Sequence, residues 1–328
     1  MKQVLLTGAG GFIGSHLAEV LVQQGHRVRA LLRYNAGQRC GWLDTLPPPL
    51  RREIEVVFGD VRDPDRMNDA CQGVEQVFHL AALIAIPYSY HAPESYLDTN
   101  LRGTLNLLRA ARQQGVAQVL LTSSSEVYGT ARYVPMDEVH PLEAQSPYAA
   151  SKTAADQLGL AWYHSFGLPV RIVRPFNTYG PRQSLRAVIP SIIVQLLRGA
   201  DELHLGSLTP TRDFNYVGDT ARAFAAIAEA PGLDGQVVQV ATGQEVAIGD
   251  LAARLVARLR PHARIASVPA RVRPDTSEVY RLCGSPARLH AGTSFRAAYD
   301  LDSGIEACID WFSRPENLAY YPPDAYAL

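Results

Sequence analysis

The residues best suited to chemistry in this sequence are a tyrosine and a lysine four positions apart, Tyr148 and Lys152. On a helix this spacing places both side chains on one face. A tyrosine with an ordinary pKa of about 10 is a poor base at neutral pH, but an adjacent ammonium lowers that pKa and favours the phenolate. Ser124, in a serine run upstream, would hold the hydroxyl that Tyr148 deprotonates. These residues predict proton transfer at a substrate hydroxyl.

A glycine-rich segment near the N-terminus predicts a dinucleotide site. Gly8, Gly11 and Gly14 follow a predicted strand and open a predicted helix. Glycine permits a tight turn and lets the backbone approach a pyrophosphate, while the N-terminus of the helix favours the anion. Phe12 and Ile13, which lie between the glycines, are included in the expected cofactor site.

The residue after the second predicted strand bears on the choice of cofactor. NAD-binding units usually place Asp or Glu there for the ribose diol. This sequence has Arg33 instead, whose forked guanidinium suits the 2′-phosphate of NADP. We therefore expect NADP or NAD, with NADP slightly favoured; the less favoured alternative is that Arg33 is simply a solvated arginine. Asp60 and Val61, after the next strand, would contact the adenine, or Asp60 would cap a helix.

The elements that must position these residues alternate regularly through the first half of the chain. Strands are predicted at 2–6, 27–32, 53–57, 76–80, 118–122 and 170–173. Helices are predicted at 14–24, 100–114 and 148–166. This alternation indicates an α/β fold, a Rossmann-type doubly wound parallel sheet with helices on both faces.

From about residue 180 onward, prolines, arginines and polar turns interrupt this alternation. Helices are predicted at 188–198, 220–229, 250–259 and 303–312, the last being the final helix, with one strand at 236–240. We expect residues 1–180, with 209–245 returning to them, to form the dinucleotide-binding domain. Residues 181–208 and 246–328 are expected to form a smaller substrate-binding lobe over the carboxyl edge of the sheet.

The composition excludes several classes of protein. Of the 328 residues 47% are hydrophobic and 19% charged, so a core is available and disorder is ruled out for most of the chain. With 31 basic and 32 acidic residues, the net charge of −1 gives no electrostatic case for binding nucleic acid or a membrane surface. The four widely spaced cysteines predict neither disulfides nor a metal site. Without a signal peptide or a long apolar span, we expect a cytoplasmic protein.

Several motifs occur in a fixed order along nearly the whole chain. They are 7–14, 79–82, 98–100, 123–129, 148–152, 174–181 and 212–219. With these motifs the sequence resembles the extended short-chain dehydrogenases/reductases, specifically the nucleotide-sugar epimerases and dehydratases. The resemblance implies a nicotinamide cofactor that is retained through the reaction. It also implies a nucleotide-diphosphate sugar, UDP- or GDP-linked, as substrate.

The resemblance assigns binding roles to further residues. Additional cofactor contacts are expected from Leu80, Ala81, Ala82, Asn100 and Thr122. The segments 83–90 and 182–190 would line the sugar and base pockets, with contacts from Ile84, Tyr88 and Val188.

Three polar residues are implied to hold the nucleotide. Asn177 would bind the diphosphate, Arg212 the phosphates or ribose, and Arg273 would close over the nucleotide from the smaller lobe. Two arginines and an amide donor suit a doubly charged diphosphate. As alternatives, Asn177 is a turn residue and Arg212 forms a structural ion pair with Asp213.

Glu126 bears on which reaction of the family is catalysed. The 4,6-dehydratases carry a carboxylate at this place to remove the C5 proton, whereas the 4-epimerases commonly carry a small residue. Many dehydratases have Asp immediately before it as the acid for the leaving C6 hydroxyl; here that position is Ser125, and the GDP-mannose dehydratases look similar. We therefore expect a nucleotide-sugar 4,6-dehydratase with the catalytic residues Ser124, Ser125, Glu126, Tyr148 and Lys152.

Other interpretations stay open at this point. Glu126 could simply be the carboxylate at the start of a helix. A 4-epimerase remains possible, as does a UDP-glucuronate decarboxylase, because those enzymes share the run Ser-Glu-Val-Tyr-Gly. A dinucleotide-sensing module without catalysis is the alternative from another class, since folds of this type are reused for binding. The intact set of Ser124, Tyr148 and Lys152 argues against it.

The predicted helices at 100–114 and 148–166 carry alanine and leucine on more than one face. This pattern indicates burial beyond the contact with the sheet. In the enzymes that this chain resembles, such helices form a four-helix bundle between subunits. We therefore expect a homodimer.

Overall fold

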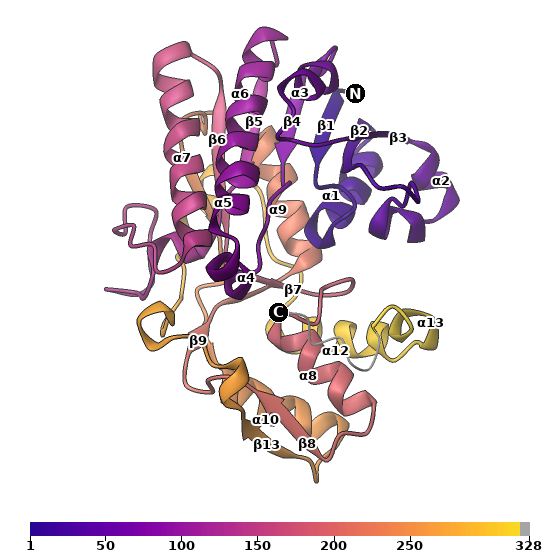
Figure 1. Ribbon diagram of the computed structural model, residues 1–328, viewed down its shortest axis with the longest axis vertical. Helices are drawn as coiled ribbons and strands as arrows, with labels where there is room; N and C mark the ends of the chain where they lie inside the picture. Colours follow the sequence, from indigo (N-terminus) through magenta and orange to yellow (C-terminus); the bar gives the residue numbers. More distant parts are fainter. Residues whose placement is uncertain (322–328) are drawn as a thin grey trace.

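The structure is a computed structural model that describes residues 1–321, and its centre is a sheet of seven parallel strands (Figure 1). The strand order is β11-β6-β5-β4-β1-β2-β3. Its strands are β1 (Gln3–Thr7), β2 (Arg27–Arg33), β3 (Ile54–Gly59), β4 (Gln76–His79), β5 (Gln118–Thr122), β6 (Val170–Pro175) and β11 (Val237–Val240). The strand sequences are rich in Val, Leu and Ile because helices cover both faces of the sheet.

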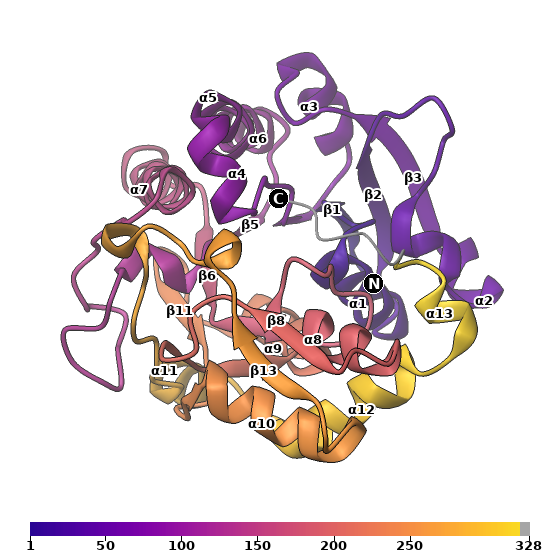
Figure 2. The ribbon, with the colours of Figure 1, turned by 60° about the horizontal axis from the view of Figure 1, so that its bottom comes forward.

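Helices form one layer on each face of the sheet (Figure 2). One layer contains α1 (Phe12–Gln23) and α9 (Val217–Glu229), which pack against each other. The other layer contains α3 (Pro64–Cys71), α6 (Gly103–Gln113) and α7 (Pro147–Phe166). Each layer buries its own hydrophobic cluster against the sheet. This arrangement confirms the predicted Rossmann-type fold.

The long helix α7, which carries Tyr148 and Lys152, has clear signals at both ends. The Ser146 hydroxyl accepts a hydrogen bond from the Ala149 N–H, and Pro147 occupies the first helical position. Gly167 ends the helix in the left-handed conformation, with φ of 68°. These signals fix the ends of the helix and therefore place Tyr148 in its first turn.

A further hydrophobic cluster lies apart from those on the sheet and is built mainly by residues from Tyr179 onward, whose elements lie below the sheet in Figure 1. Its elements are α8 (Val188–Leu197), β8 (Glu202–Leu205), α10 (Ile248–Leu259), β13 (Arg264–Ser267), α12 (Leu301–Phe312) and α13 (Pro315–Leu318). We call these elements the C-terminal lobe. Strands β8 and β13 form a separate parallel pair within it. The division into residues 1–180 with 209–245 and residues 181–208 with 246–328 stays a prediction.

Two short strand pairs connect the sheet to the lobe. Strand β7 (Asn177–Tyr179) pairs with β10 (Phe214–Tyr216), and β9 (Thr211–Arg212) pairs with β12 (Val246–Ala247). Both Asn177 and Arg212 therefore lie on backbone that joins the two parts of the molecule.

The structure contains several short elements that the sequence pattern did not predict, among them α3, β8 and β13, and it also differs from the expectations at two predicted helices. The helix at 303–312 is not the last one, because α13 follows it. The helix predicted at 100–114 is preceded by a wider π-helical turn, Leu97–Arg102, and continues as α6. A helix of four residues such as α13 is too short to show a hydrophobic period, so the sequence pattern does not reveal it.

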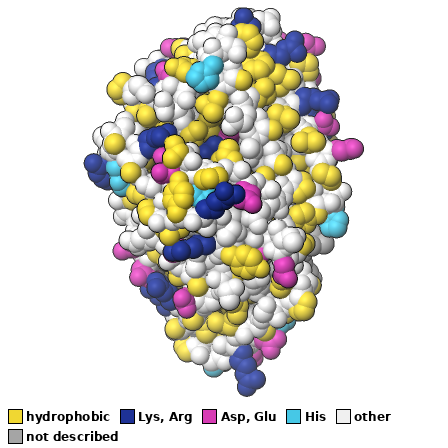
Figure 3. Space-filling model, turned by 90° about the vertical axis from the view of Figure 1, so that its left-hand side faces the viewer, with side chains coloured by type: hydrophobic (Ala, Val, Ile, Leu, Met, Phe, Trp, Pro, Cys, Tyr) yellow, Lys and Arg dark blue, Asp and Glu magenta, His cyan; other side chains and the backbone are white. Residues whose placement is uncertain are grey.

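Within residues 1–321 no helix is long and apolar enough to cross a membrane. The same part of the chain contains no group of three or more His, Cys, Asp or Glu side chains that could hold a metal ion. On the face shown in Figure 3, basic and acidic side chains are intermixed with apolar ones.

Candidate active site and family

The glycine-rich segment after β1 folds into a turn that only glycine fits. Gly8 has φ of 72°, and a Cβ atom there would lie 2.8 Å from the Ala81 nitrogen. A Cβ atom on Gly14 would lie 2.2 Å from the Gly8 carbonyl oxygen. Helix α1 begins directly after Gly11, which has no side chain to cap its first-turn amides. Phe12 and Ile13 start that helix, so the segment offers open N–H groups that fit a pyrophosphate.

The end of β4 lies beside this turn and contains a buried histidine. The Thr7 hydroxyl accepts a hydrogen bond from the Ala81 N–H at 3.1 Å and lies 2.8 Å from His79 Nδ1. Burial and, to a lesser extent, the charge of Lys152 lower the pKa of His79 to about 3, so the imidazole is neutral. Among the described residues, the buried His79 Nε2 and Thr122 Oγ1 have no hydrogen-bond partner. Such atoms at the carboxyl edge fit a site for a polar ligand.

Asn100, an expected cofactor contact, bonds instead to protein groups in this structure. Its amide accepts from the Leu83 N–H at 2.8 Å and donates to the Leu83 carbonyl at 3.0 Å. It also donates to the Ser151 hydroxyl at 2.9 Å. Asn100 thereby holds the segment after β4, with Leu80, Ala81 and Ala82, against helix α7. The structure supports a positioning role for this residue.

Strand β2 lies on the far side of β1 from β4, and its last residue, Arg33, is exposed. Asp60 accepts hydrogen bonds from Arg62 at 2.6 and 2.9 Å, and these, with the nearby Arg33, lower the pKa of Asp60. Asp60 is not a helix cap, because Asp63 caps α3 through the N–H groups of its first turn. Val61 is buried and packs toward Gly103 of α6.

Tyr148 and Lys152 lie on one face of α7, and both side chains are buried. Burial raises the pKa of Tyr148; a hydrogen bond with Ser124 lowers it, and the charge of Glu126 raises it. We expected Lys152 to lower the pKa of Tyr148, but the net shift is upward because lost hydration of the phenolate dominates. Burial also lowers the pKa of Lys152 to about 8, and the carboxylate of Asp156 opposes that shift.

The serine run after β5 forms a short 3₁₀ helix, Ser125–Tyr128. The Ser124 hydroxyl caps this helix by accepting from the Glu126 N–H at 3.2 Å, while it also contacts Tyr148. Ser125, which lies between Ser124 and Glu126 in the chain, is buried. Glu126 therefore does lie in the first turn of a helix, as the alternative interpretation holds. Its carboxylate, however, faces an arginine from another part of the chain.

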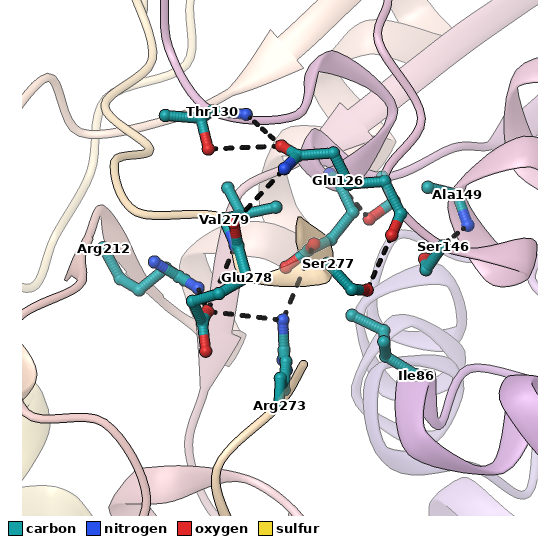
Figure 4. A network of polar contacts seen from close by, with 12 residues as sticks. Ile86, Glu126, Thr130, Ser146, Ala149, Arg212, Arg273, Ser277, Glu278 and Val279 are labelled. Carbon is teal, nitrogen blue, oxygen red and sulfur yellow. Dashed lines mark hydrogen bonds and ion pairs between the residues drawn. The ribbon is translucent and has the colours of Figure 1, made fainter. Parts of the chain in front are cut away.

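Glu126 is the first of four charged side chains that alternate in sign and lie side by side (Figure 4). Arg273 Nη1 lies 3.9 Å from Glu126 and 3.8 Å from Glu278. Arg212 donates to the same Glu278 oxygen at 3.2 Å. Burial lowers the pKa of Arg212, and the carboxylates of Glu126 and Glu278 act against that shift. We call Glu126, Arg273, Glu278 and Arg212 the charged cluster.

The charged cluster is held in place by polar contacts to the start of α7. The Ser277 hydroxyl donates to the Gln145 carbonyl at 2.6 Å, and the Gln145 amide donates to the Glu278 carbonyl at 3.2 Å. The Tyr90 hydroxyl lies 2.5 Å from Ser277 Oγ. The segment that carries Arg273 and Glu278 is therefore anchored one turn before Tyr148.

The remaining predicted substrate residues differ in their environments. Asn177 Oδ1 is buried and has no hydrogen-bond partner within residues 1–321. Val188 begins α8 and is half-buried. Tyr88, on α4 (Ile86–His91), lies with its ring 6.2 Å from that of Tyr96, which in turn packs against Tyr148. Ile84 is 67% exposed, and the structure does not bring it into the cluster around Tyr148.

Two buried carboxylates beside the predicted site were missed by sequence reasoning. Asp156 follows Lys152 by four residues, so the helical spacing that paired Tyr148 with Lys152 also indicated Asp156. Its carboxylate accepts from Ser123 Oγ at 2.6 Å and from Arg174 at 2.9 Å. Glu278 has no such signal, because it meets Arg212 across 66 residues of sequence.

Comparison with known proteins identifies the family. The family model described as GDP-mannose 4,6 dehydratase matches residues 5–308. The chain is 30% identical to a UDP-N-acetyl-alpha-D-glucosaminuronate decarboxylase of Bacillus cytotoxicus, over 96% of this chain and 99% of the relative.

Two solved structures extend the comparison. A dTDP-glucose 4,6-dehydratase of Streptomyces venezuelae, solved with NAD bound, has a TM-score of 0.84 and 28% identity, covering 98% and 99% of the two chains. A UDP-N-acetylglucosamine 4-epimerase of Methanobrevibacter ruminantium has a TM-score of 0.84 and 28% identity, covering 95% and 98%. The chain belongs to the family of GDP-mannose 4,6 dehydratase, within the extended short-chain dehydrogenases/reductases that use NAD(P) to act on nucleotide sugars.

Proposed function

We propose that this protein is a nucleotide-sugar 4,6-dehydratase that forms a 4-keto-6-deoxy sugar nucleotide. The observation that carries the proposal is the position of Glu126. Its carboxylate is buried, close enough to Tyr148 to raise the pKa of that phenol, and lies 3.9 Å from Arg273. A 4-epimerase has no step for such a base, whereas a dehydratase must remove the C5 proton of the 4-keto sugar.

The cofactor site would be formed at the carboxyl edge of the sheet. The turn at Gly8–Gly14, the first turn of α1, Thr122 and Lys152 are the residues that would hold the dinucleotide. A nicotinamide held there would supply the hydride chemistry that oxidation at C4 of the sugar and the later reduction at C6 require.

The first proton transfer falls to the residues on α7 and the serine run. Tyr148 removes the 4-hydroxyl proton while Ser124 holds that hydroxyl, and the existing contact between the two side chains supports this division. At a pH below about 8, the pKa of Lys152, this residue contributes a positive charge on the same face of α7 and would orient the cofactor ribose. General acid–base steps of this kind are each worth about 10²–10⁴-fold in rate.

The second half of the reaction would depend on Glu126. Once C4 is a ketone, the neighbouring C5 proton becomes acidic, and the Glu126 carboxylate accepts it. The C6 hydroxyl then leaves as water by taking up a proton, which the protonated Glu126 carboxylic acid can return to it, and a C5–C6 double bond forms. Ser125, next to Glu126, is the residue that we place near this leaving group.

The nucleotide part of the substrate would bind between the sheet and the C-terminal lobe. The two arginines of the charged cluster support this placement, and the Asn177 side-chain NH₂ group would donate to the diphosphate. Arg212 and Arg273 would bind the diphosphate through charge-assisted hydrogen bonds, with Val188 and Tyr88 lining the pocket. We infer a UDP- or GDP-linked sugar.

Arg33 is the residue proposed to favour NADP over NAD. It is exposed at the end of β2, where an acidic residue would otherwise bind the ribose diol. Replacing Arg33 with Ala should weaken binding of NADP by about tenfold, the loss of one charge-assisted contact, and should leave NAD binding unchanged. Equal affinities of the variant and the natural protein for NADP, measured by calorimetric titration, would remove Arg33 from this role.

The function itself is tested by incubating the protein with a panel of nucleotide sugars. We expect a 4-keto-6-deoxy product, detected by mass loss of one water and by carbonyl trapping, from a UDP- or GDP-linked hexose. The panel includes UDP-linked uronates, because the relative from Bacillus cytotoxicus is a decarboxylase. Release of carbon dioxide from a uronate, without loss of water from any hexose, would replace the proposal by that activity.

A further inference from the structure

The segment after β2 lies directly against the glycine-rich turn. The Trp42 N–H donates to the Gly10 carbonyl at 3.0 Å. Gly41 has φ of 65°, and a Cβ atom there would lie 2.4 Å from the same carbonyl oxygen. This close approach means that movement of Trp42 must displace the turn that carries the open amides of α1.

The side chain of Trp42 packs against the C-terminal lobe. Its ring lies 5.0 Å from the ring of Tyr320, 5.8 Å from Trp311 and 6.3 Å from Tyr321. It packs against the hydrophobic cluster of the lobe, although its backbone belongs to the other part of the molecule. Figure 2 shows α13 on the same side of the molecule as α2 (Pro48–Arg52).

A second, polar contact joins the lobe to the same helix α1. Arg182, in the segment that leads to α8, lies 2.6 Å from Glu19 and donates to Ser15 Oγ at 3.2 Å. His16 Nε2 lies 3.1 Å from the Pro181 carbonyl. Burial and the charge of Arg182 lower the pKa of His16 to about 4, so the neutral ring donates this bond.

The backbone at Arg182 is strained. Its φ of 70° places a non-glycine residue in the left-handed region. The surrounding contacts hold this conformation, in which the guanidinium reaches α1. The contact is therefore a fixed feature of the connection between the sheet and the lobe.

We propose that Trp42 and Arg182 form a clasp through which the C-terminal lobe holds the glycine-rich turn in its cofactor-binding geometry. Trp42 is a positioning residue in this account, and it acts on the dinucleotide through the turn. Since binding and conformation are linked reciprocally, a lobe that stabilises the turn in this geometry raises the affinity for the cofactor. Differences in affinity between variants of one site appear mostly in the dissociation rate, so we expect slower cofactor release. The inference rests on dinucleotide binding by the family and does not depend on the dehydratase reaction.

The test compares cofactor release from the natural protein and from Trp42→Ala, followed by the fluorescence of NADH and NADPH. Trp42→Ala should release the dinucleotide about tenfold faster or more, whereas Trp42→Phe, which keeps an aromatic ring, should stay within about threefold. Tyr299→Ala is the matched control. The rings of Tyr299 and Tyr216 lie 4.1 Å apart, and the ring contacts of Trp42 within residues 1–321 include neither of them, so the loss of Tyr299 removes a ring pair outside the clasp.

Tyr320→Ala keeps the test decisive if Trp42→Ala fails to fold. Tyr320 is 58% exposed, so its replacement costs little core packing, yet its ring is the nearest lobe ring to Trp42. It should speed cofactor release by about fivefold. Folded Tyr320→Ala protein with natural release rates would overturn the proposal. Because the assay contains no nucleotide sugar, its result does not depend on which reaction the enzyme catalyses.

Discussion

Burial controls the proton chemistry of Tyr148 and Lys152. Both side chains are less than a tenth exposed, and burial shifts each pKa toward the neutral form. The phenolate is therefore costly to form in the protein alone, and the hydrogen bond from Ser124 opposes that cost only in part. A base of this kind becomes effective only when another positive charge reaches the site.

Replacing Tyr148 with Phe should abolish turnover and leave nucleotide-sugar binding largely intact, since only the ionisable oxygen is lost. The rate should fall by about 10²-fold or more, while the dissociation constant changes little. Single-turnover kinetics and calorimetric titration measure the two quantities separately. A near-natural rate in this variant would remove Tyr148 from proton transfer.

The depressed pKa of Lys152 predicts a specific dependence of stability on pH. Between about pH 8, its folded-state pKa, and pH 10.5, its ordinary value, the unfolded chain binds more protons than the folded one, so stability rises with pH. Relative to Lys152→Met, the natural protein should gain about 2 kcal/mol across this window. Denaturant titrations at several pH values measure the difference, and a flat or falling one would contradict the buried-ammonium account.

At the scale of elements, α7 joins the proposed catalytic residues to the core of the sheet. Tyr148, Lys152 and Asp156 follow one another at intervals of four along its buried face. Asp156 bonds to Ser123 at the end of β5 and to Arg174 of β6. One buried carboxylate therefore fixes the helix against the strand that leads to Ser124.

Breaking this pair should destabilise the fold. Asp156→Asn leaves the Arg174 guanidinium, only 2% exposed, without a counter-charge, and loss of one partner from a buried pair costs about 3–5 kcal/mol. Glu143→Gln, which removes an exposed partner of Arg132, is the matched control and should leave the unfolding midpoint unchanged. If Asp156→Asn has the same midpoint of unfolding in denaturant as the natural protein, the pair of Asp156 and Arg174 does not hold α7 in place.

Regular elements with a clear hydrophobic period are predictable from this sequence. The strand expected at 118–122 is β5 (Gln118–Thr122), and the helix expected at 148–166 is α7 with one more residue at its start. Contacts between distant segments are not predictable in the same way. Glu278 and Trp42 are single residues whose partners lie on elements far away in the sequence, so no local sequence pattern predicts their contacts.

At the scale of the whole molecule, we predict a homodimer through α6 and α7. Phe166 at the end of α7 is 46% exposed and is covered on one side by Arg112 of α6, 4.2 Å from its ring centre. Light scattering should give twice the chain mass of 35.8 kDa. Phe166→Glu should yield monomer because it places a charge in the apolar interface, whereas Val139→Glu, at an exposed loop residue, should not. A monomeric natural protein would refute the prediction.

The most direct measurement for the dehydratase account is the fate of the reduced cofactor and of the C5 proton in Glu126→Gln. Glutamine keeps the shape and hydrogen bonding of Glu126 but cannot accept a proton. Oxidation at C4 depends on Tyr148 and Lys152 and should proceed, so the variant should accumulate reduced cofactor, seen as near-ultraviolet absorbance. The natural enzyme should show no such build-up and should incorporate solvent deuterium at C5. Normal turnover by Glu126→Gln, or product formed by the natural enzyme without deuterium at C5, would contradict the account.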